Sequence, residues 1–370
     1  MERLGVGIIG ASPLRPGWAV AAHIPALRAL PQYEIRAVST SDRNSAAAAH
    51  AAFSVPAYDN AEDLIRQADV DLVVVTVRLP SHHAIISAAL EERKMVFSEW
   101  PLAVNSAQAR DLKQRADTAE LRTAVGLQAR FSPQIQYASK LIEEGYIGKV
   151  LSTSLVGSAS AWGGVTNRNS AYLFDDANGA SPLTVSMMHA LDGLNFMLGD
   201  FKRVSAITAT RQTEVLVTDD GSTIPSTIAD QVGLCGELQS GAVASVFYRG
   251  GQSRGDNLYW QITGSDGDLV FNAPTGNVQV GELVLRMGRG SETEVTAVDV
   301  PDPARALAPD IPRGFSSNVA RLYLQFARDL QEGTHLTPDF SYACARHELV
   351  DSIRLAAATG QASRIERTTS

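Results

Sequence analysis

Short apolar runs alternate with amphipathic stretches through the first 130 residues of the chain. The apolar runs predict strands because they are short and rich in β-branched residues, and the stretches between them have helical spacing. Strands that are apolar on both faces and separated by helices are typical of a parallel sheet covered on both sides, the doubly wound Rossmann arrangement of an α/β domain. The expected strands are residues 4–10, 33–40, 71–76, 94–98 and 122–127, and the expected helices are residues 18–30, 45–53, 81–93 and 106–119.

The rest of the chain has longer strand patterns with turn sequences between them. The turns at residues 239–241 and 265–267 predict antiparallel hairpins. We therefore expect a first domain of residues 1–130 and a second α+β domain of residues 131–370, with a large, mostly antiparallel, open-faced sheet. In the second domain we expect strands at 150–160, 203–217, 229–238, 241–248, 258–263, 268–272, 277–287 and 292–300, helices at 133–144, 318–332 and 342–358, and a surface crossover at 300–314.

Composition and charge narrow the class of protein. The chain has 370 residues, 45% of them hydrophobic and 19% charged, which is ordinary for a globular protein. This length favours two domains. The net charge is −8, from 32 Lys and Arg against 40 Asp and Glu, and no basic run is present. We therefore expect no direct binding to nucleic acid.

Cysteine usage and the start of the chain bear on its location. Cys235 and Cys344 are the only cysteines, and neither lies in a Cys/His cluster, so we expect no disulfide framework and no metal site. The chain begins directly on a strand pattern, and it has no apolar stretch long enough to span a bilayer. These features predict a cytoplasmic protein that does not bind membranes.

A glycine-containing loop joins the first expected strand to the first helix. A dinucleotide fold needs glycines here, because the backbone must turn sharply and let the pyrophosphate approach the helix N-terminus. Gly10 and Gly17 fit the first and last glycine positions, Ser12 stands where the middle glycine belongs, and Trp18 follows. We interpret this segment as a dinucleotide-binding loop, although an ordinary strand-to-helix turn would also fit it.

The end of the second strand bears on the choice of cofactor. Ser39, Thr40 and Arg43 suit a 2′-phosphate, which slightly favours NADP over NAD. Asp42 could instead accept hydrogen bonds from the ribose hydroxyls of NAD. As a third alternative, Ser41 or Asp42 caps the following helix.

Motifs later in the chain resemble those of the Gfo/Idh/MocA family of NAD(P)-dependent oxidoreductases. In that family the fifth strand leads into a Glu-Lys-Pro motif, whose Glu and Lys hold the nicotinamide ribose and whose Lys assists proton transfer. Glu99 and Pro101 match this motif, but Trp100 replaces the Lys. Trp100 cannot transfer protons and would either stack on the nicotinamide or block the substrate side. The remaining matches are Pro80 and His83, after the strand expected at 71–76, and Arg130, Pro133, Gly145 and Gly148, around the start of the second domain.

The family's second catalytic motif falls near the middle of the chain. It carries Asp, then His, then a second Asp, and these positions are Val185, His189 and Asp192. His189 is the first choice for a proton donor or acceptor, because the pKa of imidazole lies nearest to neutral pH. Asp192 would orient it or tune its charge, or would face the sheet. Alternatively, His189 is simply a packed core residue.

One branch of the family shares these departures. The chain resembles the subgroup that includes the fungal galactose-pathway transcriptional inhibitor, a dinucleotide-binding regulator that sequesters an activator. The matching segments are Gly17-Trp18 with His23 and Pro25, Glu99-Trp100, Leu127-Gln128 with Arg130 and Ser132-Pro133, residues 145–148, and Tyr172, Asp175 and Asn178-Gly179.

Two classes of function follow from this resemblance. The first is an oxidoreductase that transfers a hydride between NAD(P) and a small sugar, polyol or related hydroxy or carbonyl compound. The second is a catalytically silent, dinucleotide-binding regulator or sensor that acts through a protein partner. For both we expect a homo-oligomer formed through the C-terminal sheet, because an open apolar face must be covered.

The expected site residues fall into three groups. The catalytic residues would be His189 and Asp192. The cofactor would contact Gly10, Ser12, Gly17, Trp18, Ser39, Thr40, Arg43, Thr76, His83, Glu99, Trp100 and Gln128, and the substrate would contact Arg130, Trp162, Arg168, Tyr172, Asp175 and Asn178.

Overall fold

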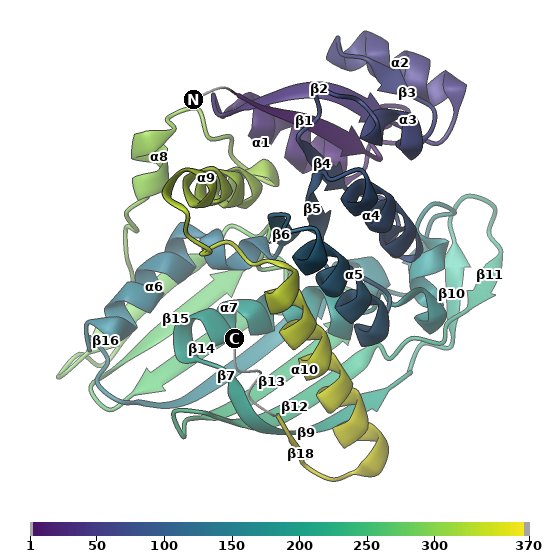
Figure 1. Cartoon of the computed structure of the whole chain (residues 1–370). Helices are drawn as coiled ribbons and strands as arrows, with labels where there is room; N and C mark the ends of the chain where they lie inside the picture. Colours follow the sequence, from purple (N-terminus) through teal and green to yellow (C-terminus); the bar gives the residue numbers. More distant parts are fainter. Residues whose placement is uncertain (1–2, 366–370) are drawn as a thin grey trace. The chain divides into compact units, whose positions relative to one another are not determined.

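The computed structural model describes residues 3–365 of the chain (Figure 1). Contacts divide it into two compact units, each built from two segments. The first unit comprises Met1–Gln128 and Asp302–Cys344, and the second comprises Ala129–Pro301 and Ala345–Ser370.

The first unit contains a six-stranded parallel sheet with the order β3-β2-β1-β4-β5-β6, which is the order of a doubly wound dinucleotide-binding fold. Its central strands are buried on both faces, as the continuous apolar runs predict. The order reverses between β1 and β4, and ligands of such sheets bind at this point. The strands are β1 (Leu4–Ile9), β2 (Tyr33–Ser39), β3 (Ala57–Tyr58), β4 (Leu72–Val75), β5 (Met95–Glu99) and β6 (Thr123–Gly126).

Helices connect these strands, and three of them begin at a side-chain cap. The side chains of Asp42, Asn60 and Asn105 accept hydrogen bonds from the first turns of α2, α3 and α5. The first helix starts as a π-helical turn, η1, and continues as α1. The helical elements are η1 (Ala19–His23), α1 (Ile24–Arg28), α2 (Arg43–Phe53), α3 (Ala61–Ile65), η2 (Leu79–Ser81), α4 (His82–Glu91), α5 (Ser106–Thr118) and η3 (Gln128–Phe131).

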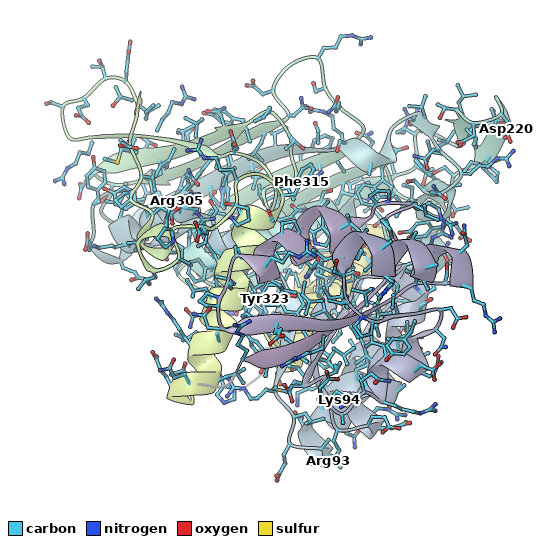
Figure 2. The ribbon with its side chains drawn as sticks, turned by 90° about the horizontal axis from the view of Figure 1, so that it is seen from above. Arg93, Lys94, Asp220, Arg305, Phe315 and Tyr323 are labelled. Atoms are coloured by element: carbon cyan, nitrogen blue, oxygen red, sulfur yellow. The ribbon has the colours of Figure 1, made fainter. Side chains whose placement is uncertain are left out.

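Two later helices also belong to the first unit, α8 (Pro303–Leu307) and α9 (Ser316–Glu332). The sequence prediction assigned every residue after 130 to the second domain, and the contacts divide the chain differently. The physical reason is that α9 packs against η1, α1 and β6. Its buried face includes Tyr323, labelled in Figure 2. Chain order alone does not show which sheet a late helix covers.

The second unit is built on a nine-stranded sheet with the order β17-β16-β15-β14-β7-β13-β12-β9-β18. Among the described strands of this sheet, all neighbours are antiparallel except β7 and β13. The turns at 239–241 and 265–267 form the predicted hairpins. The strands are β7 (Val150–Ala159), β9 (Phe201–Ala209), β12 (Gln231–Leu238), β13 (Val243–Gly250), β14 (Leu258–Gly264), β15 (Gly267–Ala273), β16 (Val284–Arg289), β17 (Thr296–Ala297) and β18 (Ser363–Arg364).

Helices cover one face of this sheet (Figure 1). Helix α7 packs against α6, and its Gly193 lies near the Trp260 side chain of β14. Helix α10 begins in the first unit and continues into the second. The helical elements are α6 (Pro133–Glu143), η4 (Ser160–Trp162), η5 (Ala171–Phe174), η6 (Asp176–Asn178), η7 (Leu183–Met187), α7 (Met188–Leu198) and α10 (Phe340–Thr359).

Three sequence predictions for the second unit were wrong in detail. The strand expected at 203–217 is interrupted after β9, and its end forms a separate three-stranded sheet of β8 (Val165–Thr166), β10 (Glu214–Val217) and β11 (Thr223–Pro225). The strand expected at 277–287 begins only at Val284, because residues 277–281 form a hydrogen-bonded turn. The strand expected at 292–300 shortens to β17.

Two further observations concern membranes and metals. Across residues 3–365, no helix has both the length and the apolar character that a membrane span requires. The same described residues contain no group of three or more His, Cys, Asp or Glu side chains that could hold a metal ion.

Candidate functional site

The carboxyl ends of the parallel strands bring the predicted cofactor residues to one edge of the first sheet. At the end of β1, Gly10 has a φ of +101°, which a residue with a side chain rarely adopts. The Gly10 and Ala11 amides both donate to the Ser39 carbonyl at 3.0 Å, which ties β1 to β2. A Cβ at Gly10 would lie 3.0 Å from Thr76 Oγ1, which itself donates to the Ile9 carbonyl at 2.7 Å. Glycine is therefore needed at the point where the strand order reverses.

Four buried polar atoms at this edge and in its loop have no hydrogen-bond partner among the described residues. They are Ser12 Oγ, Trp18 Nε1, Ser39 Oγ and Gln128 Oε1. Buried polar groups are normally paired, so a group of unpaired ones indicates a ligand or ordered water. A Cβ at Gly17 would meet no described atom within 4 Å, so the loop also leaves open space there. These features fit a dinucleotide at the edge of the sheet.

The end of β2 shows what Asp42 does. Its carboxylate accepts hydrogen bonds from Ser45 N and Ser45 Oγ, both at 2.9 Å, and caps α2. These hydrogen bonds hold the pKa of Asp42 below its ordinary value, so it is ionised at neutral pH. The exposed Arg43 pairs with Asp59 at 3.2 Å, while Thr40 Oγ1 lies 2.8 Å from Ser45 Oγ. The capping alternative is thus confirmed, and part of the positive charge of Arg43 is neutralised.

Glu99 ends β5 and is held by other residues of the first unit. Gln128 Nε2 donates to both carboxylate oxygens, at 2.8 and 2.9 Å. His23 Nε2 lies 2.9 Å from Glu99 Oε1. The next residue, Trp100, is buried with 5% of its surface exposed. His23 was absent from the predicted site residues, and its place in the motif shared with the regulator subgroup was the available signal.

The two histidines after β4 lie in different surroundings. His82 is buried, with Nε2 3.1 Å from the Val77 carbonyl, and burial lowers its pKa. His83, the predicted cofactor residue, pairs with Asp111 of α5 at 2.8 Å. The structure therefore places His83 in a contact between α4 and α5.

In the second unit, Arg130 and Asp192 form a buried ion pair. The guanidinium donates through Nε to Asp192 Oδ2 at 3.0 Å and through Nη2 to Asp192 Oδ1. Asp192 is fully buried, and Arg130 also lies over the Phe196 ring at 5.3 Å. His189 is buried in the first turn of α7 with 3% of its surface exposed. Two predicted residues with different expected roles are thus joined in one bidentate pair, a geometry that favours structural anchoring.

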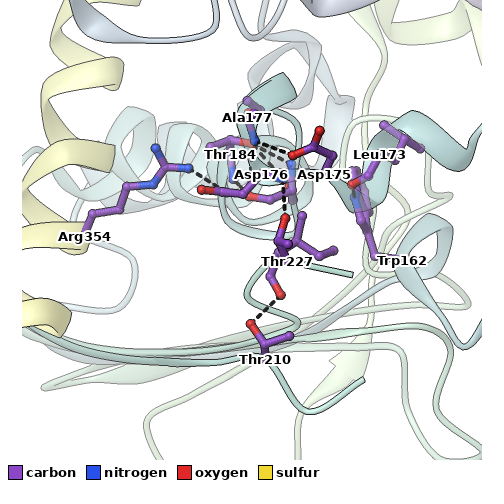
Figure 3. Close-up of polar contacts among 12 residues, drawn as sticks. Trp162, Leu173, Asp175, Asp176, Ala177, Thr184, Thr210, Thr227 and Arg354 are labelled. Atoms are coloured by element: carbon purple, nitrogen blue, oxygen red, sulfur yellow. Dashed lines mark hydrogen bonds and ion pairs between the residues drawn. The ribbon is translucent and has the colours of Figure 1, made fainter. Parts of the chain in front are cut away.

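Val185, where the resemblance expects a catalytic Asp, contacts an apolar cluster. Its half-buried side chain packs against buried residues that include Trp162 and Phe174. Trp162, a predicted substrate residue, has 4% of its surface exposed and donates from Nε1 to the Leu173 carbonyl at 3.2 Å (Figure 3). Packing explains why an apolar residue stands at position 185. The buried members of this apolar cluster are Ala159, Trp162, Phe174, Val215 and Ile228.

The other predicted substrate residues lie in short turns of the second unit. Asp175 Oδ1 accepts from the Ala177 amide at 3.0 Å, and Asn178 Nδ2 donates to the Tyr172 carbonyl at 2.9 Å. Both contacts shape the turn that precedes Gly179. Arg168 is exposed and pairs with Asp220 at 2.7 Å. Hydrogen bonds from Ser222, together with Arg168, lower the pKa of Asp220 to about 2.

An ion pair of this turn was not predicted. Arg354 of α10 pairs with Asp176 at 3.2 Å, as Figure 3 shows. Asp176 N also donates to Thr227 Oγ1 at 2.9 Å. A sequence pattern holds no signal for a partner so distant along the chain.

Comparison with protein families identifies both parts of the chain. Residues 4–127 match the family described as "Oxidoreductase family, NAD-binding Rossmann fold". Residues 133–273 match the family described as "Gal80p, C-terminal domain". The first match coincides with the parallel sheet and its glycine loop, and the second covers β7 to β15 with α6 and α7.

Relatives of two kinds are similar to this chain. The dehydrogenase aclE of Aspergillus oryzae is 30% identical over 79% of this chain and 83% of its own length. The galactose/lactose metabolism regulatory protein GAL80 of Saccharomyces cerevisiae is 28% identical over 76% of this chain and 69% of its own length.

Solved structures of both kinds share the fold. A super-repressor mutant of Gal80p from Saccharomyces cerevisiae has a TM-score of 0.87 and 24% identity, with 99% of each chain covered. Levoglucosan dehydrogenase in complex with NADH and L-sorbose has a TM-score of 0.84 and 22% identity, covering 99% of this chain and all of the other. The matched NAD-binding sheet, the Gal80p-type second part and the aclE relative together show that the chain belongs to the Gfo/Idh/MocA oxidoreductase family, in which it resembles Gal80.

Proposed function

We propose that this protein is an NAD(H)-dependent oxidoreductase that acts on a CH–OH or C=O group of a small sugar, polyol or related compound. One observation carries the proposal: the unpaired buried atoms of Ser12, Trp18, Ser39 and Gln128, which belong to the predicted cofactor positions. The similarity to the aclE dehydrogenase supports the reaction class. The L-sorbose complex of levoglucosan dehydrogenase supports a sugar-like substrate.

The cofactor residues fit NAD(H) better than NADP(H). An ionised Asp42 would repel a 2′-phosphate, and Arg43 already pairs with Asp59. The slight preference for NADP drawn from the sequence is therefore not kept. In the proposed site, Gly10, Ser12, Gly17 and Trp18 hold the pyrophosphate side, Ser39 and Thr40 the adenosine ribose, and Thr76, Glu99, Trp100 and Gln128 the nicotinamide side.

Proton transfer needs a group other than Trp100 or Val185, since neither side chain exchanges protons. The bound dinucleotide would supply or accept the hydride. His189 is the proposed proton donor or acceptor, because imidazole is the side chain that most often serves as general acid or base. Asp192 is not given this role here, because its carboxylate is held by Arg130. Arg168, Tyr172, Asp175 and Asn178 remain proposed substrate contacts.

Cofactor binding and turnover test the proposal separately. NADH should raise the melting temperature and quench tryptophan fluorescence, and NADPH should do so at higher concentration. A panel of sugars, cyclitols and sugar acids, assayed with NAD and NADP, should then reveal a substrate. His189→Ala should lower kcat by about 100-fold or more. Undiminished turnover in His189→Ala would remove this residue from the mechanism.

A regulator or sensor is the second candidate, and the packing of Val185 favours it. An apolar side chain built into a hydrophobic cluster cannot supply the acid or base expected at this position. GAL80 is named as a regulatory protein, and a protein of this type would bind a protein partner in response to the dinucleotide. Tight NADH binding without turnover on any substrate of the panel would favour this candidate.

We also propose that the large sheet mediates self-association. Four exposed apolar side chains, Val156, Ile207, Phe247 and Val284, lie on the uncovered face (Figure 1), along one cross-strand row that also passes through Gly233, Tyr259 and Asn272. A row of this kind can pair with its own copy about a two-fold axis. Phe247→Lys should then shift the mass measured by light scattering toward the monomer. Leu355→Lys, at an exposed apolar position on α10, should leave the mass unchanged.

The cysteines support a location in the cytoplasm, which is also a proposal. Cys235 is exposed on β12, Cys344 is buried on α10, and neither forms a disulfide within the described residues. An exposed free thiol suits a reducing compartment, since it would be oxidised elsewhere.

A further inference from the structure

His23 lies at the centre of a buried hydrogen-bonded chain in the first unit. It is fully buried and ends the π-helical turn η1. Its Nε2 lies 2.9 Å from Glu99 Oε1, and its Nδ1 lies 2.7 Å from the hydroxyl of Tyr323. Both ring nitrogens are therefore engaged, one with the end of β5 and the other with α9. Single π-turns occur often at functional sites, where they redirect a side chain.

The chemistry of the partners fixes the direction of these hydrogen bonds. An ionised carboxylate only accepts, and both Glu99 oxygens already accept from Gln128 Nε2. His23 Nε2 must then donate to Glu99, and in the tautomer with a single proton on Nε2 the Nδ1 atom accepts from Tyr323. Burial raises the pKa of Tyr323 well above its ordinary value, so its hydroxyl keeps the proton that it donates. The hydrogen bonds therefore run from the Tyr323 hydroxyl to His23 and from His23 to the Glu99 carboxylate.

Packing holds each member of this chain in place. The Tyr323 ring stacks on Phe97 with centroids 4.7 Å apart, and the Tyr323 carbonyl accepts from the Tyr33 hydroxyl at 2.7 Å. On the other side, a Cβ at Gly126 would overlap Glu99 Oε1. The carboxylate of Glu99 thus occupies one position, set by α9, η1 and β6 (Figure 2 labels Tyr323).

We propose that His23 and Tyr323 are positioning residues for dinucleotide binding, which act by fixing the Glu99 carboxylate at the carboxyl edge of the sheet. This inference rests on the proposed function, because it needs a dinucleotide at this edge. It also gives α9 a role beyond packing, since a helix from the late segment of the chain completes the support of a residue on β5. Neither His23 nor Tyr323 has to touch the ligand.

The test measures the dissociation constant for NADH by fluorescence in four variants of the full chain. Tyr323→Phe keeps the ring stacking and removes only the hydroxyl, and we expect binding to weaken about tenfold. His23→Leu removes the donor to Glu99, and we expect a loss of about 10- to 100-fold. His23→Gln keeps an N–H donor at a similar reach, so it should recover part of that loss.

Tyr33→Phe is the matched control. It removes a buried hydroxyl from the same cluster of aromatic rings. That hydroxyl donates to the Tyr323 carbonyl and takes no part in the hydrogen bonds that lead to Glu99. It should leave NADH binding unchanged while lowering the melting temperature about as much as Tyr323→Phe.

Three results would overturn the inference. The first is wild-type NADH affinity in Tyr323→Phe, which decides the matter even if His23→Leu does not fold. The second is an equal loss of affinity in Tyr33→Phe, which would show a merely structural effect. The third is a wild-type protein that binds neither NADH nor NADPH at millimolar concentration. That last result alone would also overturn the proposed function, so the two failures can be told apart.

Discussion

At the carboxyl edge of the first sheet several predicted site residues keep an unpaired buried atom, whereas beside α7 two predicted site residues, Arg130 and Asp192, pair with each other. At the sheet edge, buried atoms such as Ser12 Oγ and Gln128 Oε1 have no partner among the described residues. Around α7, the charges of Arg130 and Asp192 meet each other, and Val185 packs into an apolar cluster. Unpaired buried groups indicate a ligand or ordered water, and the Arg130–Asp192 pair needs neither. Asn195 Oδ1 of α7 is also buried without a partner among the described residues, so the contrast concerns the charged pair and Val185. We infer from this difference that the proposed dinucleotide site and the proposed catalytic region have separate structural requirements.

This separation matches the two kinds of relatives. A solved Gal80p structure and a solved levoglucosan dehydrogenase structure both share the fold of this chain. In the two catalytic motifs of the family, this chain departs from the resemblance at the Lys position, which is Trp100, and at the first Asp position, which is Val185. A test that perturbs one region without the other therefore separates the two candidate functions.

The largest expected effect concerns the buried ion pair. Arg130→Met leaves the Asp192 carboxylate buried without its cation, so we expect the free energy of unfolding to fall by about 3–5 kcal/mol. The double variant Arg130→Met/Asp192→Leu removes both charges and should regain most of this loss. Urea unfolding followed by circular dichroism measures both effects.

An exposed pair of the same unit gives the matched control. Lys202 and Glu237 lie 2.9 Å apart on the sheet surface, and Lys202→Met should cost at most about 1 kcal/mol. If Arg130→Met cost no more than this control, the pair would not anchor the region. Asp192 would then return as a candidate for the chemistry.

The sequence predicted most of the fold because local patterns specify its elements. Continuous apolar runs such as Leu72–Val75 identified the parallel strands, and turn glycines identified the hairpins. Helix α7 was not predicted as an element, because it is buried almost all round and so lacks an amphipathic period. The place of α9 in the first unit also could not be predicted, since it depends on contacts between distant parts of the chain.

For the candidate site, the sequence predicted which residues lie at the strand ends but not how their side chains pair. Residues at strand ends, such as Gly10, Thr76 and Glu99, share an edge because of the topology, so the sequence order located them. Side-chain partners are set by three-dimensional contacts, so the pairing of Arg130 with Asp192 and the contact of His83 with Asp111 were not foreseen.

The second prediction introduces the family's acid into the apolar cluster. Val185→Asp would place a carboxylate against Trp162 and Phe174, so we expect a loss of stability of about 2 kcal/mol and no gain of activity. Val185→Thr, which has nearly the same shape, should cost about half as much. Thermal melts and the substrate panel measure the outcome. A rise in dehydrogenase activity in Val185→Asp would show that the region keeps a catalytic geometry, and the contrast between the two regions would disappear.

The third prediction concerns the open space at the glycine loop. A Cβ at Gly17 meets no described atom within 4 Å, so Gly17→Ala should not lower the melting temperature. NADH affinity should nevertheless fall about tenfold, because the pyrophosphate must approach this backbone closely. Gly255→Ala is the control, since its Cβ would lie 3.8 Å from Ser253 Oγ in a loop of the second unit. Unchanged affinity in Gly17→Ala would exclude this loop as the pyrophosphate site.

The smallest expected effect separates the two cofactors at the end of β2. Asp42→Asn keeps a capping oxygen for α2, so stability should change by less than about 0.5 kcal/mol. Because the substitution removes the negative charge that would repel the 2′-phosphate, it should raise the affinity for NADPH relative to NADH by a few-fold. Because its pKa is lowered, Asp42 is already ionised at neutral pH, and the wild-type preference for NADH should stay constant from about pH 7 to pH 9. Asp63→Asn, at the N-terminus of α3, provides the control for nonspecific charge effects. An equal change of the relative affinity for NADPH in both variants would mean that the overall electrostatic potential at this edge of the sheet, rather than Asp42, selects the cofactor.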